Sequence, residues 1–352
     1  MGKYKCFPVL FLLSLSGFMD IRKRREQQTH HFTLSVILPT YNRVDILART
    51  LTALEKQTLP KNEFEVIVVN DGSDDGTDSF LERYKNSGKL NFSYLTKENE
   101  GQGIARNAGL KLADGYIVVF TQDDHIPDPT FLAEHKRVHE VYATHNFMCL
   151  GYTTWHPELD INPYMRYLEH SGMQFNYPAL EKRKLIDPML GVRLADFHFF
   201  YGGNVSVKRL LLDEQHFDPR FKKYGWEDIE LGYRLEKEEH AILLYHRGAK
   251  AFHYHEQTES ELPKRMKQVG RSARLAQKIA PKMRITPPWW KHVIFFLLAN
   301  RFSKLLVDKV TLALEKKWPP SKPLPLSRRL RYYVHMKHYF LAGLSSGPKK
   351  QK

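Results

Sequence analysis

The sequence predicts an α/β fold in which helices flank a mostly parallel, doubly wound sheet. Apolar runs rich in β-branched residues, such as 64–69 and 116–120, are typical of parallel strands buried on both faces. They alternate with segments of helical periodicity, and such βαβα order favours right-handed crossovers. With 42% hydrophobic and 26% charged residues, the 352-residue chain has a globular composition, which excludes disorder throughout.

The first half of the chain contains the regular elements. In chain order we expect a strand at 34–38, a helix at 46–54, a strand at 64–69, a helix at 78–84, a strand at 92–95, a helix at 103–112 and a strand at 116–120. The alternation fades after Asp124, where a helix opened by Pro127 and a mixed region follow. We assign the folded domain to residues 33–262 and a short apolar and basic leader to 1–32.

Residues 263–352 form a basic, aromatic, helical appendage. They contain 22 Lys/Arg against two acids, a net charge of +20, whereas residues 1–262 have 32 Lys/Arg against 37 Asp/Glu. A predicted helix at 289–314 interleaves aromatic and basic side chains, which suits an anionic membrane surface. The alternative is an amphipathic helix packed on the domain. Nucleic acid is not an expected partner, because the appendage has no recognised nucleic-acid-binding motif.

The chain has two cysteines, Cys6 and Cys149, so neither a disulfide framework nor a zinc site is indicated. The apolar stretch at 6–19 is short for a membrane span, and the basic run Arg22-Lys23-Arg24-Arg25 follows it. A weak anchor and a disordered leader both remain open. The expected location is the cytoplasm, with peripheral attachment to the inner face of the plasma membrane as a second option.

Polar residues follow the first two predicted strands. Pro39, Thr40 and Tyr41 end the first strand, and Asp71 ends the second. Because carboxyl ends of parallel strands meet at one edge, a flat ring and a carboxylate would lie together there and could hold a nucleoside. Taken singly, each segment could be only a turn rich in Asn, Asp and Gly.

Arg106 follows a glycine-containing segment at the start of a predicted helix. Glycines allow close approach of a ligand, and a guanidinium can grip a base or phosphate in a planar fork. The pattern lacks the GxGxxG spacing after a first strand, which argues against NAD.

Asp123 and Asp124 end the strand expected at the centre of the sheet. Adjacent carboxylates in a cleft repel unless a cation neutralises them, and oxygen ligands suit Mg²⁺ or Mn²⁺. His253 could add a nitrogen ligand beside Asp124. A solvated turn is the alternative for the acid pair, and chance is the alternative for one histidine among 17.

A second acid pair, Glu227 and Asp228, opens a predicted helix after Trp226. Simple helix capping would explain the acids. In a cleft, however, one carboxylate could take the proton of an attacking hydroxyl while Trp226 offers a surface to a sugar ring. We place Gly203, Asn204 and Trp226 on the acceptor side.

In this order the segments resemble family 2 inverting glycosyltransferases, which have the GT-A fold, over roughly residues 33–263. The resemblance implies a nucleotide-sugar donor, commonly of UDP or dTDP, held by Pro39, Thr40, Tyr41, Asp71 and Arg106. It places Asp123 and Asp124 on the family's DxD region, where many members have three acids and this chain has Gln122 first. Metal binding should therefore depend chiefly on Asp124. It also implies Asp228 as the base and Glu227 as its neighbour.

The implied reaction is a single displacement at the anomeric carbon, with transfer to a glycan or lipid-linked acceptor in cell-envelope polysaccharide or glycolipid synthesis. Processive synthases that resemble this chain carry a Gln-x-x-Arg-Trp motif and several membrane-spanning helices. Here Gln268-Val269-Gly270-Arg271 is followed by Ser272, and no stretch of about 20 apolar residues exists, so that class is excluded. Two alternatives remain. A nucleotidyltransferase should have a glycine-rich phosphate loop after its first strand, where this chain has Pro39-Thr40-Tyr41-Asn42. A nucleic-acid-binding protein would bind its ligand through the basic appendage.

Overall fold

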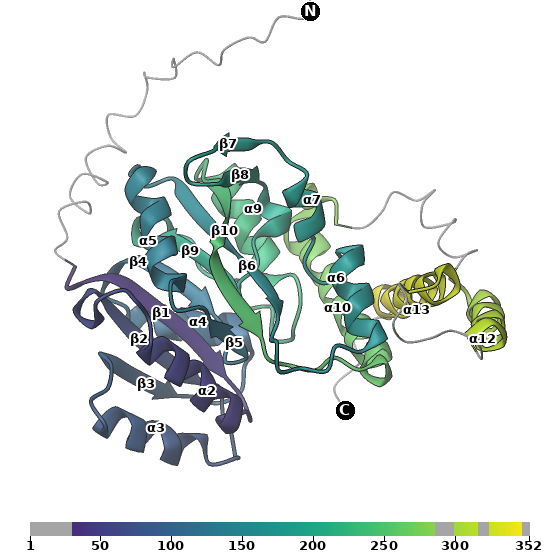
Figure 1. The fold of residues 1–352 in the computed structure, drawn as a ribbon, viewed down its shortest axis with the longest axis horizontal. Helices are drawn as coiled ribbons and strands as arrows, with labels where there is room; N and C mark the ends of the chain where they lie inside the picture. The colour runs from purple at the N-terminus through teal and green to yellow at the C-terminus, as the bar shows by residue number, and fades with distance from the viewer. Residues whose placement is uncertain (1–29, 286–298, 316–323, 347–352) are drawn as a thin grey trace, which may run out of the picture.

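The computed structural model describes residues 30–285, 299–315 and 324–346, and they form one α/β body with appended helices (Figure 1). The question of an N-terminal anchor lies outside the described residues. The strands are β1 (Phe32–Thr40), β2 (Phe64–Asn70), β3 (Phe92–Thr96), β4 (Gly115–Thr121), β5 (His125–Pro127), β6 (Phe147–Trp155), β7 (Leu185–Asp187), β8 (Val192–Ala195), β9 (Asn204–Lys208) and β10 (Ile242–His253). The helices are α2 (Val44–Glu55), α3 (Thr77–Asn86), α4 (Gln102–Leu112), α5 (Phe131–Val141), α6 (Pro163–Ser171), α7 (Tyr177–Glu181), α8 (Arg209–Leu212), α9 (Glu227–Lys237), α10 (Leu262–Ile279), α12 (Arg301–Glu315) and α13 (Leu326–Ser345).

The strands form one sheet in the order β3-β2-β1-β4-β9-β6-β10-β8-β7, with β5 paired to β10. The pairs β2–β3, β1–β2 and β1–β4 are parallel, so the carboxyl ends of these strands share one edge. Strand β9 runs antiparallel between β4 and β6. The predicted α/β class with a central parallel sheet is confirmed.

Both faces of the sheet are buried, as the β-branched runs predict. Ile37, Val69 and Phe120 point into one hydrophobic core, whereas their strand neighbours, such as Leu38 and Val68, point into the other. This alternation is the two-residue period of a strand. The result is a rigid support that ends in the polar loops of the site.

The C-terminal appendage is helical, as expected. Helices α10 and α13 contact each other through glycines. A Cβ added to Gly270 would lie 2.2 Å from the carbonyl oxygen of Phe340, and a Cβ added to Gly343 would lie 2.1 Å from the carbonyl oxygen of Lys267. Any larger side chain would separate the helices. The first part of the helix predicted at 289–314 lies outside the described residues, and its second part is α12.

Candidate active site

The loop after β1 joins two predicted site segments. The Thr40 hydroxyl, which is buried, donates to Asp123 Oδ2 at 2.8 Å, so Thr40 orients a carboxylate at the end of β4. Pro39 lies one residue earlier in β1, in register with Val69 of β2. The Tyr41 side chain is 48% exposed at the sheet edge, so its ring is free to stack on a flat ligand.

Asp71 is buried at the end of β2, and its carboxylate organises the loop before α4. Oδ1 accepts hydrogen bonds from Lys97 Nζ at 3.0 Å and the Glu100 backbone N–H at 3.1 Å, and Oδ2 accepts one from the Gly101 N–H at 2.8 Å. We expected Asp71 to accept directly from a nucleoside. In this structure it sets the start of α4, the helix that carries Arg106.

Asp123 and Asp124 are both buried, and Arg43 forms an ion pair with each of them. Its Nη1 lies 2.6 Å from Asp124 Oδ2 and 3.2 Å from Asp123 Oδ1. Burial, helped by the charge of Asp124, raises the pKa of Asp123 to about 7. Burial would also raise the pKa of Asp124, but the interactions with His253, His125 and Arg43 together outweigh it and lower that pKa.

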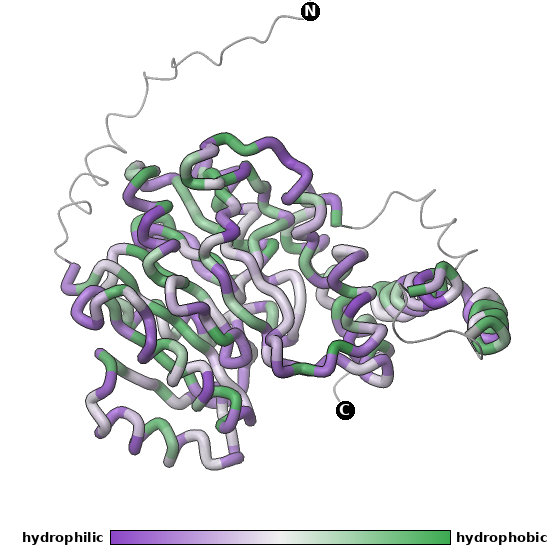
Figure 2. The backbone as a smooth tube through the Cα atoms, in the orientation of Figure 1, coloured by the Kyte–Doolittle hydropathy of each residue, from purple (hydrophilic) through white to green (hydrophobic). Residues whose placement is uncertain are grey.

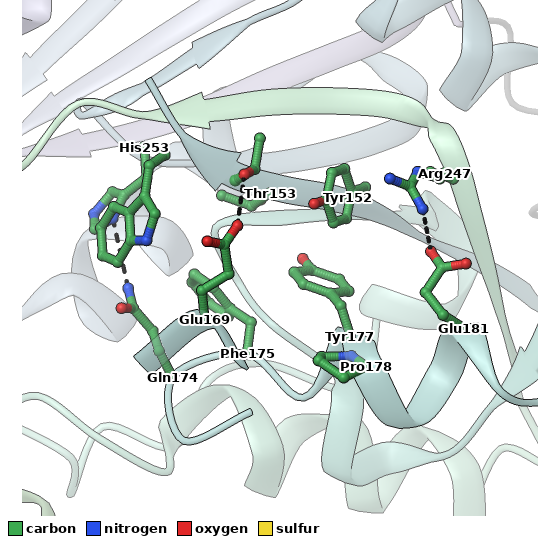
Figure 3. A pocket seen from close by; sticks show the side chains of 12 residues that line it. Tyr152, Thr153, Glu169, Gln174, Phe175, Tyr177, Pro178, Glu181, Arg247 and His253 are labelled. Atoms are coloured by element: carbon green, nitrogen blue, oxygen red, sulfur yellow. Dashed lines mark hydrogen bonds and ion pairs between the residues drawn. The ribbon is translucent and has the colours of Figure 1, made fainter. Parts of the chain in front are cut away.

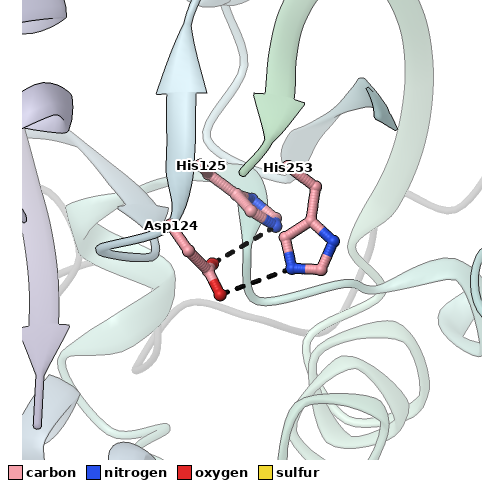
Figure 4. Close-up of side chains that lie close together, drawn as sticks. All are labelled: Asp124, His125 and His253. Atoms are coloured by element: carbon pink, nitrogen blue, oxygen red, sulfur yellow. Dashed lines mark ion pairs between the residues drawn. The ribbon is translucent and has the colours of Figure 1, made fainter. Parts of the chain in front are cut away.

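Asp124 also lies beside two histidines (Figure 4). Strand β5 pairs with β10 in a register that sets His125 opposite His253, with ring centroids 5.0 Å apart. His253 Nε2 lies 3.4 Å and His125 Nε2 4.0 Å from oxygens of Asp124. One ligand atom from each of the three residues falls within 4.8 Å of the others.

This cluster fits a divalent cation. His125 Nδ1 lies 2.6 Å from the Gly203 carbonyl oxygen, which can only accept, so Nδ1 carries the proton and Nε2 a lone pair. Burial lowers the pKa of His125 to about 4, so the ring is neutral near pH 7. His125 Nε2 and Asp124 Oδ1 are buried and have no hydrogen-bond partner among the described residues. A cation bound between these two atoms would satisfy both of them.

Arg106 lies between the two acid pairs. It is 1% exposed, and none of its three nitrogens has a hydrogen-bond partner in the described part of the chain. Its guanidinium stands over the Phe217 ring at 5.4 Å and interacts electrostatically with Glu227, Asp228 and Asp123. Burial lowers the pKa of Arg106. A guanidinium with unused buried donors is costly unless a ligand completes it.

Glu227 and Asp228 open α9 beside Arg106. The Gly202 N–H donates to Asp228 Oδ2 at 3.1 Å, the Gly225 N–H donates to Glu227 at 2.8 Å, and Gln102 donates to the other oxygen of Glu227. Burial, reinforced by Asp228, raises the pKa of Glu227 to about 7, and burial also raises the pKa of Asp228. A raised pKa makes a carboxylate a better proton acceptor.

Two residues that we expected on the acceptor side have structural roles here. The Asn204 side chain is 1% exposed, and its Nδ2 donates to the Tyr152 and Ala249 carbonyls while Oδ1 faces His135. Its amide is therefore used within the sheet. Gly203 is buried too, and an added Cβ would lie 2.5 Å from His125, so this glycine makes room for the imidazole.

Trp226 is partly buried and has a positive φ of 74°. Its indole Nε1 donates to the Val269 carbonyl at 3.2 Å, which joins the start of α9 to α10. The ring thus connects the acid pair to the basic appendage. Any contact with an acceptor would use the part of the ring that is left accessible.

Residues 35–200 match the model of the family described as Glycosyl transferase family 2. The chain carries a family 2 glycosyltransferase domain. The match favours sugar transfer over the nucleotidyltransferase and nucleic-acid-binding alternatives.

Known relatives agree with this assignment. Hyaluronan synthase of Pasteurella multocida is 29% identical over 248 residues, covering 63% of this chain and 25% of that synthase. Validoxylamine A glucosyltransferase of Streptomyces hygroscopicus subsp. jinggangensis is 30% identical over 229 residues, covering 59% of this chain and 52% of that enzyme. The chain thus spans between a quarter and about half of the length of these relatives.

A solved structure supports the fold of the glycosyltransferase. A mannosyltransferase from Pyrobaculum calidifontis, in complex with GDP-Man and Mn²⁺, superposes with a TM-score of 0.56 at 20% identity. The superposition covers 93% of this chain and 92% of the mannosyltransferase.

Two residues of this glycosyltransferase site were absent from the sequence-based prediction. Arg43 is the N-cap residue of α2, where a positive charge is disfavoured by the helix dipole. This unfavourable placement was the signal in the sequence that an acidic partner lies nearby. His125 adjoins the acid pair, but only the pairing of β5 with β10 reveals that it faces His253.

Proposed function

We propose that this glycosyltransferase moves a sugar from a nucleotide-sugar donor of the UDP or dTDP type to a hydroxyl of a glycan or lipid-linked acceptor, with inversion. The observation that carries the proposal is the position of Arg106, which is buried with unused donors between Asp123 and the pair Glu227–Asp228. Because the Arg106 guanidinium interacts electrostatically with both acid pairs, we place the leaving group and the base in one cleft. The name of one relative, a hyaluronan synthase, supports a role in polysaccharide synthesis.

We propose Asp124, His125 and His253 as the residues that hold the cation. The sequence suggested Mg²⁺ or Mn²⁺, and a donor set with two imidazole nitrogens favours Mn²⁺, because Mg²⁺ strongly prefers oxygen. When bound, such a cation offsets the charge of a nucleotide diphosphate. Arg43 remains on Asp124 Oδ2, away from the orphaned Oδ1, so it supplies a second positive charge at this position.

In the proposed reaction, Asp228 accepts the proton of the acceptor hydroxyl. The acceptor oxygen then bonds to the anomeric carbon as the bond from that carbon to the diphosphate oxygen breaks. Attack from the face opposite the leaving group inverts the configuration. The Gly202 N–H fixes the Asp228 carboxylate, and Arg106 donates to the oxygens on which negative charge grows. Tyr41 stacks on the base of the nucleotide.

We further propose that the appendage holds the enzyme at an anionic membrane surface. Helix α12 is oriented with polar residues inward: Asp308 pairs with Arg331 at 2.7 Å and with His335 at 2.9 Å on α13. Its outward residues include Phe302 at 74% and Leu312 at 69% exposure. Figure 2 shows this hydrophobic colouring at the edge of the molecule, away from the sheet.

An amphipathic surface of this kind with basic neighbours suits lipid headgroups. Within the described residues, every helix falls short of the length and apolarity of a bilayer span. Sedimentation with anionic vesicles, compared between the full chain and Leu305→Asp, measures this attachment, and equal sedimentation of both proteins contradicts it.

A donor screen tests the proposed reaction. The full chain is incubated with UDP-, dTDP- and GDP-sugars and Mn²⁺, and release of nucleotide diphosphate is measured. We expect release from at least one donor, lost in Asp228→Asn and kept in the exposed control Asp160→Asn. Release of pyrophosphate from nucleoside triphosphates, with no reaction of any nucleotide sugar, would contradict the proposal.

A further inference from the structure

A cavity of about 130 Å³ lies beside the proposed cation site, between the strands β6 and β10 and the segment that contains α6 and α7 (Figure 3). It shares His253 with the cluster of Asp124, His125 and His253. Its walls come from residues to which the proposed reaction gives no role. They are Tyr152, Thr153, Thr154, Trp155, Glu169 and Gln174, followed by Phe175, Tyr177, Pro178, Glu181 and Arg247.

The cavity has aromatic walls. Tyr152 and Tyr177 meet edge to face at 5.0 Å, and Phe175 lies 5.7 Å from Tyr177. Trp155 stacks on His253, with ring centroids 5.3 Å apart and planes 27° apart. Rings of this kind offer apolar faces to the C–H surface of a sugar.

A few polar groups interrupt these walls. Gln174 Oε1 is buried and has no hydrogen-bond partner among the described residues, so it can accept from a ligand hydroxyl or amide. Glu169 accepts a hydrogen bond from the Thr154 hydroxyl at 3.1 Å and is otherwise exposed. Its remaining lone pairs can accept from a second hydroxyl.

The charges of the cavity disfavour an anion. Glu181 is matched by Arg247 at 3.2 Å and Arg193 at 3.5 Å, and it accepts a hydrogen bond from Tyr245 at 2.6 Å. Glu169 has no basic partner within ion-pair distance among the described residues. The local balance is therefore negative at the Glu169 end, which repels phosphate and carboxylate groups.

We propose that this cavity binds an uncharged sugar ring of the acceptor, adjacent to the hydroxyl that is glycosylated. The inference rests on the proposed sugar transfer and names its acceptor class. The acceptor is favoured over the donor because the donor residues come from the ends of β1, β2 and β4, none of which lines the cavity, and because the cavity shares only His253 with the cation cluster. Phe175 also contacts Tyr201, which precedes the Gly202 that holds Asp228, so the cavity adjoins the proposed base.

The test uses saturation-transfer NMR on the full chain with three probes: methyl β-D-glucopyranoside, methyl N-acetyl-β-D-glucosaminide and glycerol 3-phosphate. We expect at least one glycoside to bind and the anionic probe not to bind. Glu169→Ala should weaken the glycoside about tenfold, the effect of losing a hydrogen bond to a charged group. The matched control is Glu158→Ala, an exposed glutamate whose partner is Arg49, and it should bind like the parent.

A second variant, Phe175→Leu, keeps an apolar side chain but removes a ring from the wall, and thermal unfolding shows whether it folds. We expect weaker glycoside binding. Equal binding by the parent and both cavity variants, preference for glycerol 3-phosphate, or no binding of either glycoside would overturn the proposal. Displacement of the glycoside by a nucleotide sugar but not by its nucleotide diphosphate would assign the cavity to the donor sugar and also overturn it.

These outcomes are separate from those of the proposed reaction. A chain that releases no nucleotide diphosphate from any donor, yet binds the glycosides through Glu169, would refute sugar transfer while the cavity keeps its ligand. Normal donor hydrolysis with unaltered glycoside binding in Glu169→Ala would refute the cavity alone.

Discussion

Arg43→Gln tests whether a protein cation, rather than a metal alone, holds the acid pair of the cleft. The variant removes a guanidinium whose Nη1 lies 2.6 Å from Asp124 and 3.2 Å from Asp123. Each hydrogen bond to a charged group contributes roughly 1.5–3 kcal/mol. The Arg43 side chain is 36% exposed, so solvent screening reduces the sum, and we expect a loss of about 2 kcal/mol of unfolding free energy.

The assay is thermal and urea unfolding with and without Mn²⁺. For a domain of this size, a loss of about 2 kcal/mol lowers Tm by roughly 4–8 °C. Mn²⁺ should raise the Tm of Arg43→Gln more than that of the parent, because the ion replaces the missing charge at Asp124. The control is Arg137→Gln, a side chain 55% exposed and 3.9 Å from Glu134, which should change little. Equal stability of Arg43→Gln and this control would refute the reasoning.

Four further predictions concern the base, the cation and the appendage. Asp228→Asn should lower kcat by about 10²–10⁴-fold with donor affinity unchanged, and loss of donor binding instead would remove its role as base. Because the pKa of Glu227 is raised to about 7, the folded chain binds more protons than the unfolded chain between about pH 4.5 and that value, so unfolding free energy should fall as pH rises through this window. Urea titrations should show that Glu227→Gln reduces this slope, to which Asp123 also contributes because its pKa is raised to about 7, and an unchanged slope would mean that Glu227 does not contribute to it. Asp124→Asn should abolish Mn²⁺ binding measured by calorimetry and with it Mn²⁺-dependent donor binding, whereas tight binding by the variant would exclude the cluster. Gly270→Val should separate α10 from α13 and speed amide exchange in α13, and unchanged protection would contradict the close contact.

The parallel half of the fold followed from the sequence because its signals are local. The run at 64–69 is buried along its whole length in β2, and turn residues mark the ends of β1 and β2. The antiparallel half was less predictable. The residues after Asp124 include β9, which pairs with β4 although it begins 83 positions after the end of that strand, and which inserts between β4 and β6. Periodicity contains no information about such long-range pairing.

The same distinction applies to the site. Asp123, Asp124, Glu227 and Asp228 stood out because acids at strand ends and helix starts have a chemical rationale in the sequence. His125 did not, since its partner is 128 positions away across an antiparallel register. Asn204 was misplaced for the opposite reason: next to two glycines it resembles a binding loop, but its amide is used up inside the sheet.

The most direct test of the account is a crystal structure of Asp228→Asn with Mn²⁺ and the donor identified in the screen. The account predicts an anomalous manganese peak between Asp124, His125 and His253, with the diphosphate beside it and the anomeric carbon facing residue 228. A nucleotide sugar bound in a different cavity from the manganese, or out of reach of residue 228, would contradict it.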